Sequence, residues 1–291
     1  MTSAGCAMLA SVLASAAPGD TVKLAEDCGD TVLVRNVAVA APGVVVDATG
    51  RTFANGIRLL NVQGVTFRGG TYRKDRPDPR SYAAEIRGGG ALLFDGATFT
   101  GAARGMVIGA TQGITVRNSR FIGLESDGID IAGKGDNGLI ENNRFADFKP
   151  ALATCTLADG AKLNMVGRGK CSGMGGSWRD GQHPDAIQTW GGWGTLVARN
   201  NIIENMDGSP AMTMGITTHG KGPPQRFDIE GNRLHLAFSA GIANVSQSGK
   251  VTGNVLRGDG TRRTGIRVGP GVTACGNKIA DIPSSAATRP C

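Results

Sequence analysis

The side chains best suited to acid–base chemistry are concentrated in residues 182–190. This segment reads Gln-His-Pro-Asp-Ala-Ile-Gln-Thr-Trp and so contains an imidazole, a carboxylate, an amide and an indole. His183 can exchange protons near neutral pH, and Asp185 can orient it or act with it. Trp190 offers a flat face for a sugar ring. The alternatives are that His183 is a loop residue bonded to Asp185 and that Trp190 and Trp193 cover a glycine-rich core.

A second segment, residues 125–131, carries further carboxylates in the pattern Glu-Ser-Asp-Gly-Ile-Asp-Ile. If the two segments form neighbouring strands, Asp127 lies beside Asp185 and Asp130 beside Gln188, with strands about 4.8 Å apart. Like charges at that spacing are costly without a cation, a shared proton or a basic neighbour. This cost predicts a functional cluster. The alternative is that both aspartates cap turns by accepting backbone N–H groups.

The sequence therefore provides candidates for three roles. The catalytic candidates are Asp127, His183, Asp185, His219 and Lys221. The candidates for substrate binding are Arg104, Asp130, Gln188, Trp190 and Arg267. The candidate metal ligands are Asp127, Asp130 and Asp185. Because Ca²⁺ prefers oxygen ligands, calcium is the metal to expect on these carboxylates.

Repeated short strands must position these residues. Runs of β-branched residues closed by Asn or Gly return about 22 to 24 positions apart, for example at residues 116–121 and 140–145. A second run in each repeat alternates with a period of two. It occurs at residues 105–108, 128–131, 186–189, 211–214 and 265–268. In the fourth of these, the alternation points Met212 inward and Thr213 outward. Such coils bury their apolar face only by stacking, which predicts an all-β, parallel β-helix over residues 1–291.

A column of polar residues recurs at one bend of the predicted coils. Its members are Ser119, Asn143, Asn201, Asn232, Asn254 and Asn277. Asn tolerates left-handed backbone geometry, and stacked amides can bond to one another along the axis. We therefore interpret this column as part of the scaffold.

The repeat pattern resembles the right-handed parallel β-helix proteins of the pectate-lyase superfamily. Residues 8–24 look like the amphipathic helix, Pro-Gly-Asp turn and first strand that cap such solenoids, so residues 1–24 are expected to form the N-terminal cap and first strand. Residues 125–131 are similar to the Asn-Thr-Asp-Gly-x-Asp segment of the polygalacturonase-type hydrolases, and Asp127 matches the first catalytic aspartate of that family. The resemblance implies a polysaccharide-acting enzyme, although His183-Pro184-Asp185 stands where the hydrolases have a pair of aspartates.

Three departures from the repeat predict loops. They are the basic segment 72–82, the long segment 149–182 and the segment 217–226. Long departures from a regular scaffold often carry function. The second and third flank the coil that contains Asp185, so we expect them to wall one cleft.

The six cysteines fall into three local pairs. Of about 15 pairings that six cysteines allow, proximity favours one set. It consists of Cys6–Cys28, Cys155–Cys171 and Cys275–Cys291. Three disulfides indicate a secreted or periplasmic protein. The Ala-rich start lacks the basic residues of a signal peptide, and no apolar run is long enough to span a membrane.

The formal net charge of +7 favours an acidic polysaccharide as partner over nucleic acid, for which no binding motif is present. A solubilising role for this charge is the alternative. These features predict a monomer that acts as a lyase and cleaves a uronate polymer by β-elimination. A hydrolase with paired aspartates is the main alternative, and a uronate epimerase or a non-catalytic glycan-binding module are the others.

Overall fold

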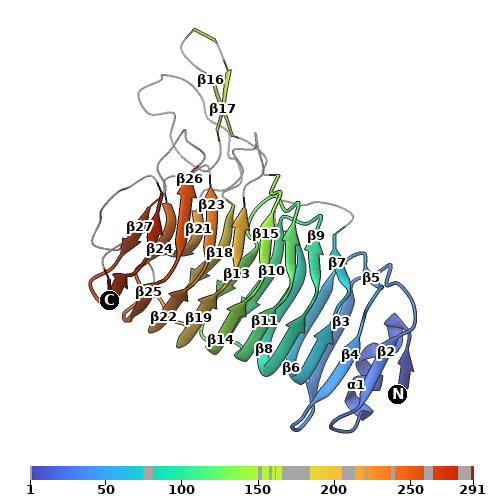
Figure 1. Cartoon of the computed structure of the whole chain (residues 1–291). Helices are drawn as coiled ribbons and strands as arrows, with labels where there is room; N and C mark the ends of the chain where they lie inside the picture. The colour runs from blue at the N-terminus through green and yellow to red at the C-terminus, as the bar shows by residue number, and fades with distance from the viewer. Residues whose placement is uncertain are drawn as a thin grey trace.

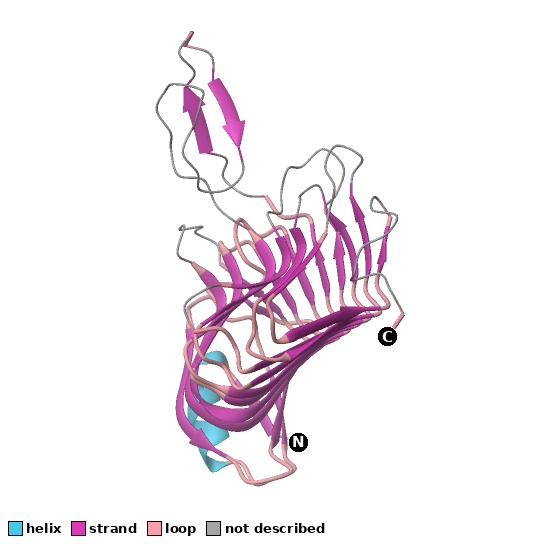
Figure 2. Cartoon of the chain, turned by 90° about the vertical axis from the view of Figure 1, so that its left-hand side faces the viewer, coloured by secondary structure: helices cyan, strands magenta, loops and turns pink. Residues whose placement is uncertain are grey.

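The strands of this computed structural model follow one another in stacked coils that run from the N-terminal to the C-terminal end (Figure 1). The structure describes residues 2–74, 81–149, 153–156, 159–160, 162–165, 184–204, 214–219, 222–236, 240–258, 265–280 and 290–291. Strands of successive coils overlie one another when the molecule is turned by 90° (Figure 2). Every pair of strands that the structure describes within the stack is parallel, as the repeat predicts.

Three ladders of parallel strands build the described part of the stack. Ladder one contains β3 (Val32–Ala38), β6 (Ile57–Arg68), β8 (Tyr82–Asp95), β10 (Arg104–Gly109), β13 (Ile129–Ala132), β18 (Asp185–Trp190), β21 (Met214–Thr218), β24 (Ala240–Asn244) and β27 (Ile266–Val268). Ladder two contains β1 (Thr2–Ala4), β2 (Thr21–Leu24), β4 (Val44–Asp47), the second halves of β6 and β8, β11 (Gln112–Arg117), β14 (Asp136–Glu141), β19 (Thr195–Arg199), β22 (Arg226–Glu230), β25 (Gly249–Thr252) and β28 (Val272–Cys275). Ladder three contains β5 (Thr52–Phe53), β7 (Thr71–Arg73), β9 (Thr98–Thr100), β12 (Arg120–Ile122), β15 (Arg144–Ala146), β20 (Ile202–Glu204), β23 (Arg233–Leu236), β26 (Val255–Gly258) and β29 (Lys278–Ile279).

The N-terminal end of the stack is capped as the sequence predicts. The short 3-10 helix Cys6–Met8 leads into α1 (Leu9–Ser15), which buries Leu9 and Leu13. This helix covers the first coil, whose strand edges would otherwise be open. Within the described residues, no helix has both the length and the apolar character needed to cross a membrane.

Disulfides close both ends of the described stack. The bonds Cys6–Cys28 and Cys275–Cys291 confirm two of the predicted pairs. The predicted pair Cys155–Cys171 lies outside the described side chains. In the long segment 149–182, strands β16 (Ala153–Thr156) and β17 (Lys162–Met165) form an antiparallel pair separate from the three ladders.

Stacked aromatic rings fill the core beneath ladder three. Phe53, Tyr72, Phe99, Phe121 and Phe145 are fully buried, and neighbouring rings stack with centroids 4.5 to 5.1 Å apart. The sequence prediction that a loop begins at Tyr72 is therefore wrong. Tyr72 belongs to β7, because its ring continues the stack, and the basic residues that suggested a loop begin only after it.

The asparagine column is confirmed as scaffold. Each amide from Asn143 to Asn254 donates to the side-chain oxygen of the next member, at 2.9 to 3.1 Å. Its backbone geometry differs from the prediction. The left-handed residue is the one before each column member, such as Asn142 and Asn200, both with φ of 55°. The column residues are instead held by amide bonds that would be costly to leave unmade in the interior.

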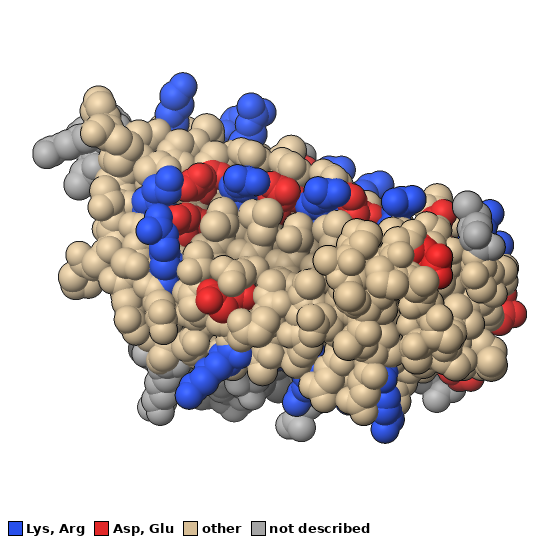
Figure 3. Space-filling view, turned by 90° about the horizontal axis from the view of Figure 1, so that it is seen from below, with Lys and Arg blue, Asp and Glu red and all other residues tan. Residues whose placement is uncertain are grey.

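Ladder two carries a row of alternating charges on its outer face, and such a row is visible in Figure 3. In register, the row consists of Lys23, Asp47, Arg68, Asp95, Arg117, Glu141, Arg199 and Glu230. Arg117 and Asp95 approach to 2.8 Å, and Arg199 and Glu141 to 2.7 Å. Opposite charges directly across neighbouring strands favour this register over its alternatives.

The strand predicted at residues 211–214 is displaced towards the C-terminus. The structure places β21 at Met214–Thr218, where Ile216 pairs with Ile187 and Thr217 with Gln188. Thr213, expected to point outward beside Gln188, lies outside the described residues. The alternation of apolar residues continues from 212 to 216, so the pattern did not mark where pairing starts. The predicted loop 217–226 consequently begins inside β21 and ends inside β22.

Candidate active site

The first residues of consecutive strands in ladder one bring the predicted cluster together. Arg104 pairs with Tyr82 of the preceding coil. The N–H of Gly105 donates to the carbonyl of Asp127, and the N–H of Gly128 donates to the carbonyl of Asp185. Arg104, Asp127 and Asp185 are therefore axial neighbours, as the alignment of repeats predicts. Three residues further along the same two strands, Asp130 lies beside Gln188, so the second predicted pair is confirmed as well.

Asp127 is the centre of this cluster. It is 3 % exposed, and its Oδ1 accepts the backbone N–H of Asp185 at 3.2 Å. In the amide orientation that satisfies both its neighbours, Gln188 donates Nε2–H to the same oxygen at 3.0 Å. The other oxygen, Oδ2, accepts from Arg104 Nε at 3.2 Å and from Ser126 Oγ at 3.3 Å. All of these donors fix the orientation of the carboxyl group.

The surroundings of Asp127 favour its protonated form. Burial, followed by the charges of Asp185 and Asp130, raises its pKa from 3.8 to about 7, although Arg104 acts in the opposite direction. Burial also raises the pKa of Asp130, and Arg104, 3.4 Å from its Oδ2, opposes this rise. The repulsion between the clustered carboxylates is thus reduced in two ways: Asp127 can hold a proton, and the guanidinium of Arg104 lies beside Asp127 and Asp130.

A histidine and an indole connect this buried centre to the surface. His219 follows β21 and places Nε2 3.5 Å from Oδ2 of the fully buried Asp185. Its ring stacks on Trp190, with centroids 4.4 Å apart and planes 16° apart. The indole N–H of Trp190 donates to Oε1 of Gln188. Since Trp190 is 45 % exposed, this series of contacts leads from an open aromatic face to Asp127.

A groove that the sequence analysis missed runs beside these residues. It has a volume of about 280 Å³ and is lined by Arg87, Val107, Gly109, Ala110, Ala132 and Gly133. Gly109, Ala132 and Trp190 occupy equivalent places in three successive coils. The two small residues leave a hollow between the indole and Arg87. Small residues at that outward place were the signal that could have revealed the groove.

Of the remaining predicted site residues, the structure describes only Arg267, and it does not lie in the cluster. Arg267 lies on the same outward column, but four coils from Asp130, which is roughly 19 Å at the usual strand spacing. His183 and Lys221 lie outside the described residues.

The calcium site stays a prediction. Within the described residues, no three His, Cys, Asp or Glu side chains are arranged to hold one metal ion. Both oxygens of Asp127 already accept hydrogen bonds from protein donors, and Arg104 lies against Asp127 and Asp130. These carboxylates are therefore arranged around a guanidinium, and the donor set as it stands does not suit calcium.

Comparison with known proteins identifies the family. A model of the right-handed β-helix region matches residues 30–256. No curated protein sequence matches the chain. Similar solved structures include an alginate lyase from Paenibacillus sp. str. FPU-7 (14 % identity, TM-score 0.44, covering 94 % of this chain and 98 % of that one). A second is the pectate lyase Pel9A (14 % identity, TM-score 0.46, covering 92 % of this chain and 73 % of that one). A third is PfbA, a surface adhesin of Streptococcus pneumoniae (11 % identity, TM-score 0.30, covering 89 % of this chain and 74 % of that one). Since the family model spans most of the chain and the strands stack as parallel coils, the protein belongs to the right-handed β-helix family.

Proposed function

We propose that the outer face of ladder one binds an acidic polysaccharide and cleaves it by β-elimination. The observation that carries this proposal is the pairing of Asp127, whose pKa of about 7 lets it hold a proton, with the partly exposed Arg104. The two disulfides fit a secreted or periplasmic location for such an enzyme.

Each requirement of the elimination has a candidate group. Arg104 is one-third exposed, so a uronate carboxylate can approach its guanidinium and lose part of its charge there. His219, 25 % exposed and oriented by Asp185, is our candidate base for the C5 proton. Protonated Asp127 is our candidate acid for the glycosidic oxygen. The C5–H bond breaks and its proton passes to His219. The C4–O bond breaks, the leaving oxygen takes the proton of Asp127, and a C4–C5 double bond forms.

Fully buried Asp185 has a different proposed role from the one expected from the sequence. Its side chain has no exposed surface, so it acts on a substrate through His219 and Asp127 and not by contact. We therefore assign it as a positioning residue. Gln188 has the same kind of role, because its amide joins Trp190 to Asp127.

Hydrolysis is the second candidate. A buried carboxyl group with a raised pKa beside another carboxylate is also the arrangement of a glycosidase acid–base pair, and Asp127 with Asp130 offers it. The two reactions differ in their products, because only elimination creates a double bond conjugated to the uronate carboxylate.

Incubation with a panel of uronate polymers tests the proposal. We expect the ultraviolet absorbance of the unsaturated uronate to rise together with new reducing ends. Neutral polymers of similar length serve as controls and should give neither signal. Reducing ends that appear without this absorbance would replace elimination by hydrolysis, and the absence of both signals on every uronate polymer would refute cleavage of this substrate class.

Filling the groove should weaken substrate binding. In Ala132→Trp, the indole would occupy the hollow between Gly109 and Trp190, so we expect affinity for the cleaved polymer to fall at least about tenfold, or about 1.4 kcal/mol. Leu139→Trp, on the outer face of ladder two, is the matched control and should bind as the unsubstituted protein does. Equal affinities for all three proteins, measured by calorimetry, would show that the groove is not used.

A further inference from the structure

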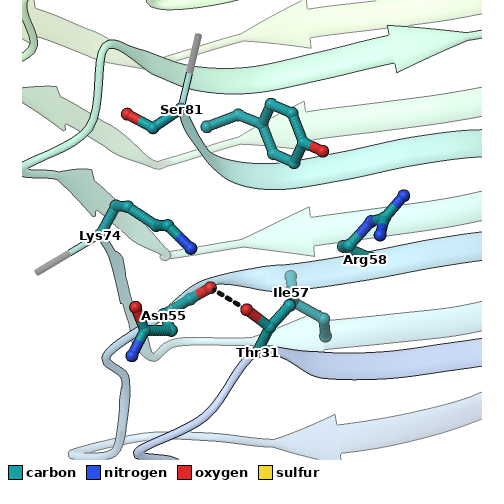
Figure 4. A pocket seen from close by; sticks show the side chains of 7 residues that line it. Thr31, Asn55, Ile57, Arg58, Lys74 and Ser81 are labelled. Atoms are coloured by element: carbon teal, nitrogen blue, oxygen red, sulfur yellow. Dashed lines mark hydrogen bonds between the residues drawn. The ribbon is translucent and has the colours of Figure 1, made fainter. Parts of the chain in front are cut away.

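A second polar pocket lies at the beginning of ladder one, several coils before Asp127. It has a volume of about 310 Å³ and is lined by Thr31, Asn55, Ile57, Arg58, Lys74, Ser81 and Tyr82. Figure 4 shows Lys74 and Asn55 on one side of this space and Arg58 and Ile57 on another. The pocket is distinct from the groove beside Trp190, because the two share no lining residue.

Hydrogen bonds hold the described wall of the pocket, and the charged residues in that part of the wall are basic. Thr31 Oγ1 donates to the carbonyl of Asn55 at 2.9 Å, and Ser81 Oγ accepts the N–H of Ala103 at 3.0 Å. Among the lining residues that the structure describes are two cations, Arg58 and Lys74, and no carboxylate. Within the described residues, Lys74 forms no ion pair. A pocket of this kind favours an anionic group over a neutral one.

A buried glutamate builds the inner side of this basic region. Glu85 is 1 % exposed and accepts from Arg58 Nε at 2.6 Å, from Arg87 Nε at 2.6 Å and from Tyr82 Oη at 2.9 Å. Burial acts to raise the pKa of Glu85, but the hydrogen bonds from Arg58 and Tyr82 outweigh it and lower the pKa. One negative charge is thus shared by two guanidiniums, and with Lys74 the described side chains of this region carry a net positive charge.

The register places this region in line with the candidate active site. Tyr82 lies beside Arg104, and Arg104 lies beside Asp127. Two strand spacings separate Tyr82 from Asp127, which is on the order of 10 Å. A glycan lying along the axis of the stack and reaching Asp127 would therefore extend over the pocket after a few sugar units.

We propose that this pocket is a distal subsite that binds the anionic substituent, carboxylate or sulfate, of a sugar unit in the same glycan chain that Asp127 acts on. The inference rests on the proposed function and adds a direction to it. The acidic substrate extends from the reacting bond towards the N-terminal coils, where Lys74 and Arg58 contact its charge. Long oligosaccharides reach the pocket, and the shortest ones do not.

The test compares substrate lengths in a variant that removes one charge. In Lys74→Gln, kcat/KM should fall about tenfold for long uronate oligosaccharides, the size expected for one charge-assisted contact, and stay unchanged for the shortest one cleaved. Lys278→Gln is the matched control, because it removes one positive charge from an exposed position of ladder three, and it should change neither value. A fall of equal size for short and long substrates, or no fall, would overturn the subsite.

Direct binding separates this proposal from the proposed reaction. If the unsubstituted protein cleaves no uronate polymer, calorimetric titration with uronate and sulfated oligosaccharides still tests the pocket. Binding that weakens in Lys74→Gln but not in Lys278→Gln supports an anionic glycan site, and the better ligand tells carboxylate from sulfate. Equal binding by both variants, or binding of neither oligosaccharide, would refute it. Arg58→Lys, which keeps the charge near Glu85, should bind more tightly than Lys74→Gln.

Discussion

Asp127→Asn is expected to reduce turnover at least about a hundredfold while leaving the protein folded. Asn has nearly the same shape and can still accept the N–H groups of Asp185 and Gln188. It cannot donate the proton that Asp127 holds at a pKa of about 7. For the unsubstituted protein, the same group should make the rate fall as the pH rises above about 7.

The same substitution should change how stability depends on pH. The folded-state pKa of Asp127 is about 7 and its ordinary value is 3.8, so the folded protein binds this proton more tightly than the unfolded chain. Stability from this group is therefore greatest at low pH, falls as the pH rises from about 4 to 7, and is constant above that. The slope is about 1.4 kcal/mol per pH unit, or about 2 to 3 kcal/mol between pH 5 and pH 7. Asn does not ionise, so Asp127→Asn should lack this fall.

Urea unfolding between pH 5 and pH 8 measures the difference. Asp95→Asn is the control, because Arg117 and Asn118 lower the pKa of Asp95 below 3.8 despite its partial burial. Asp95 is therefore ionised throughout this pH range, and its replacement should leave the fall in stability between pH 5 and pH 7 unchanged. An Asp127→Asn protein with the pH dependence of the unsubstituted chain would contradict the raised pKa. An Asp127→Asn protein with normal turnover would show that Asp127 takes no part in the reaction.

The register of the site was predictable because two segments share one pattern. Residues 128–131 and 186–189 each alternate with a period of two and open on a small residue, and aligning Gly128 with Ala186 stacks Ile129 on Ile187. That alignment sets Asp127 beside Asp185 and Asp130 beside Gln188. The fold was equally accessible, since the asparagine column and the strand repeat are local signals that recur in every coil.

The features of the structure that could not be predicted from the sequence depend on contacts between coils that leave no pattern in the local sequence. The alternating residues from 212 to 216 fit a strand at several starting points, so only the pairing of Ile216 with Ile187 places β21. The stacking of His219 on Trp190 joins residues of different coils after a strand ends, where no repeat applies. Loop patterns also misled at Tyr72, whose ring is selected by neighbours above and below it in the core.

Arg104→Gln should have the second large effect, because one guanidinium serves both Asp127 and the proposed substrate. Without it, turnover on a uronate polymer should fall on the order of a hundredfold, as when a single charge-stabilising donor is removed from an active site. The pKa of Asp127 should also rise further, since Arg104 is the cation that lowers it. The alkaline limb of the remaining activity should then move to higher pH.

The free energy of unfolding gives an independent test of the role of the Arg104 charge. Removing Arg104 leaves Asp127 and Asp130 with less compensation, and this matters more when they are ionised. We therefore expect the loss of unfolding free energy in Arg104→Gln to grow as the pH rises through 7, reaching about 3 kcal/mol. Arg104→Lys keeps the charge and should recover part of both effects, whereas Arg120→Gln removes an exposed arginine from ladder three and should change neither. A pH profile of Arg104→Gln that moves towards acid, or does not move, would show that Arg104 and Asp127 are not coupled as their contact implies.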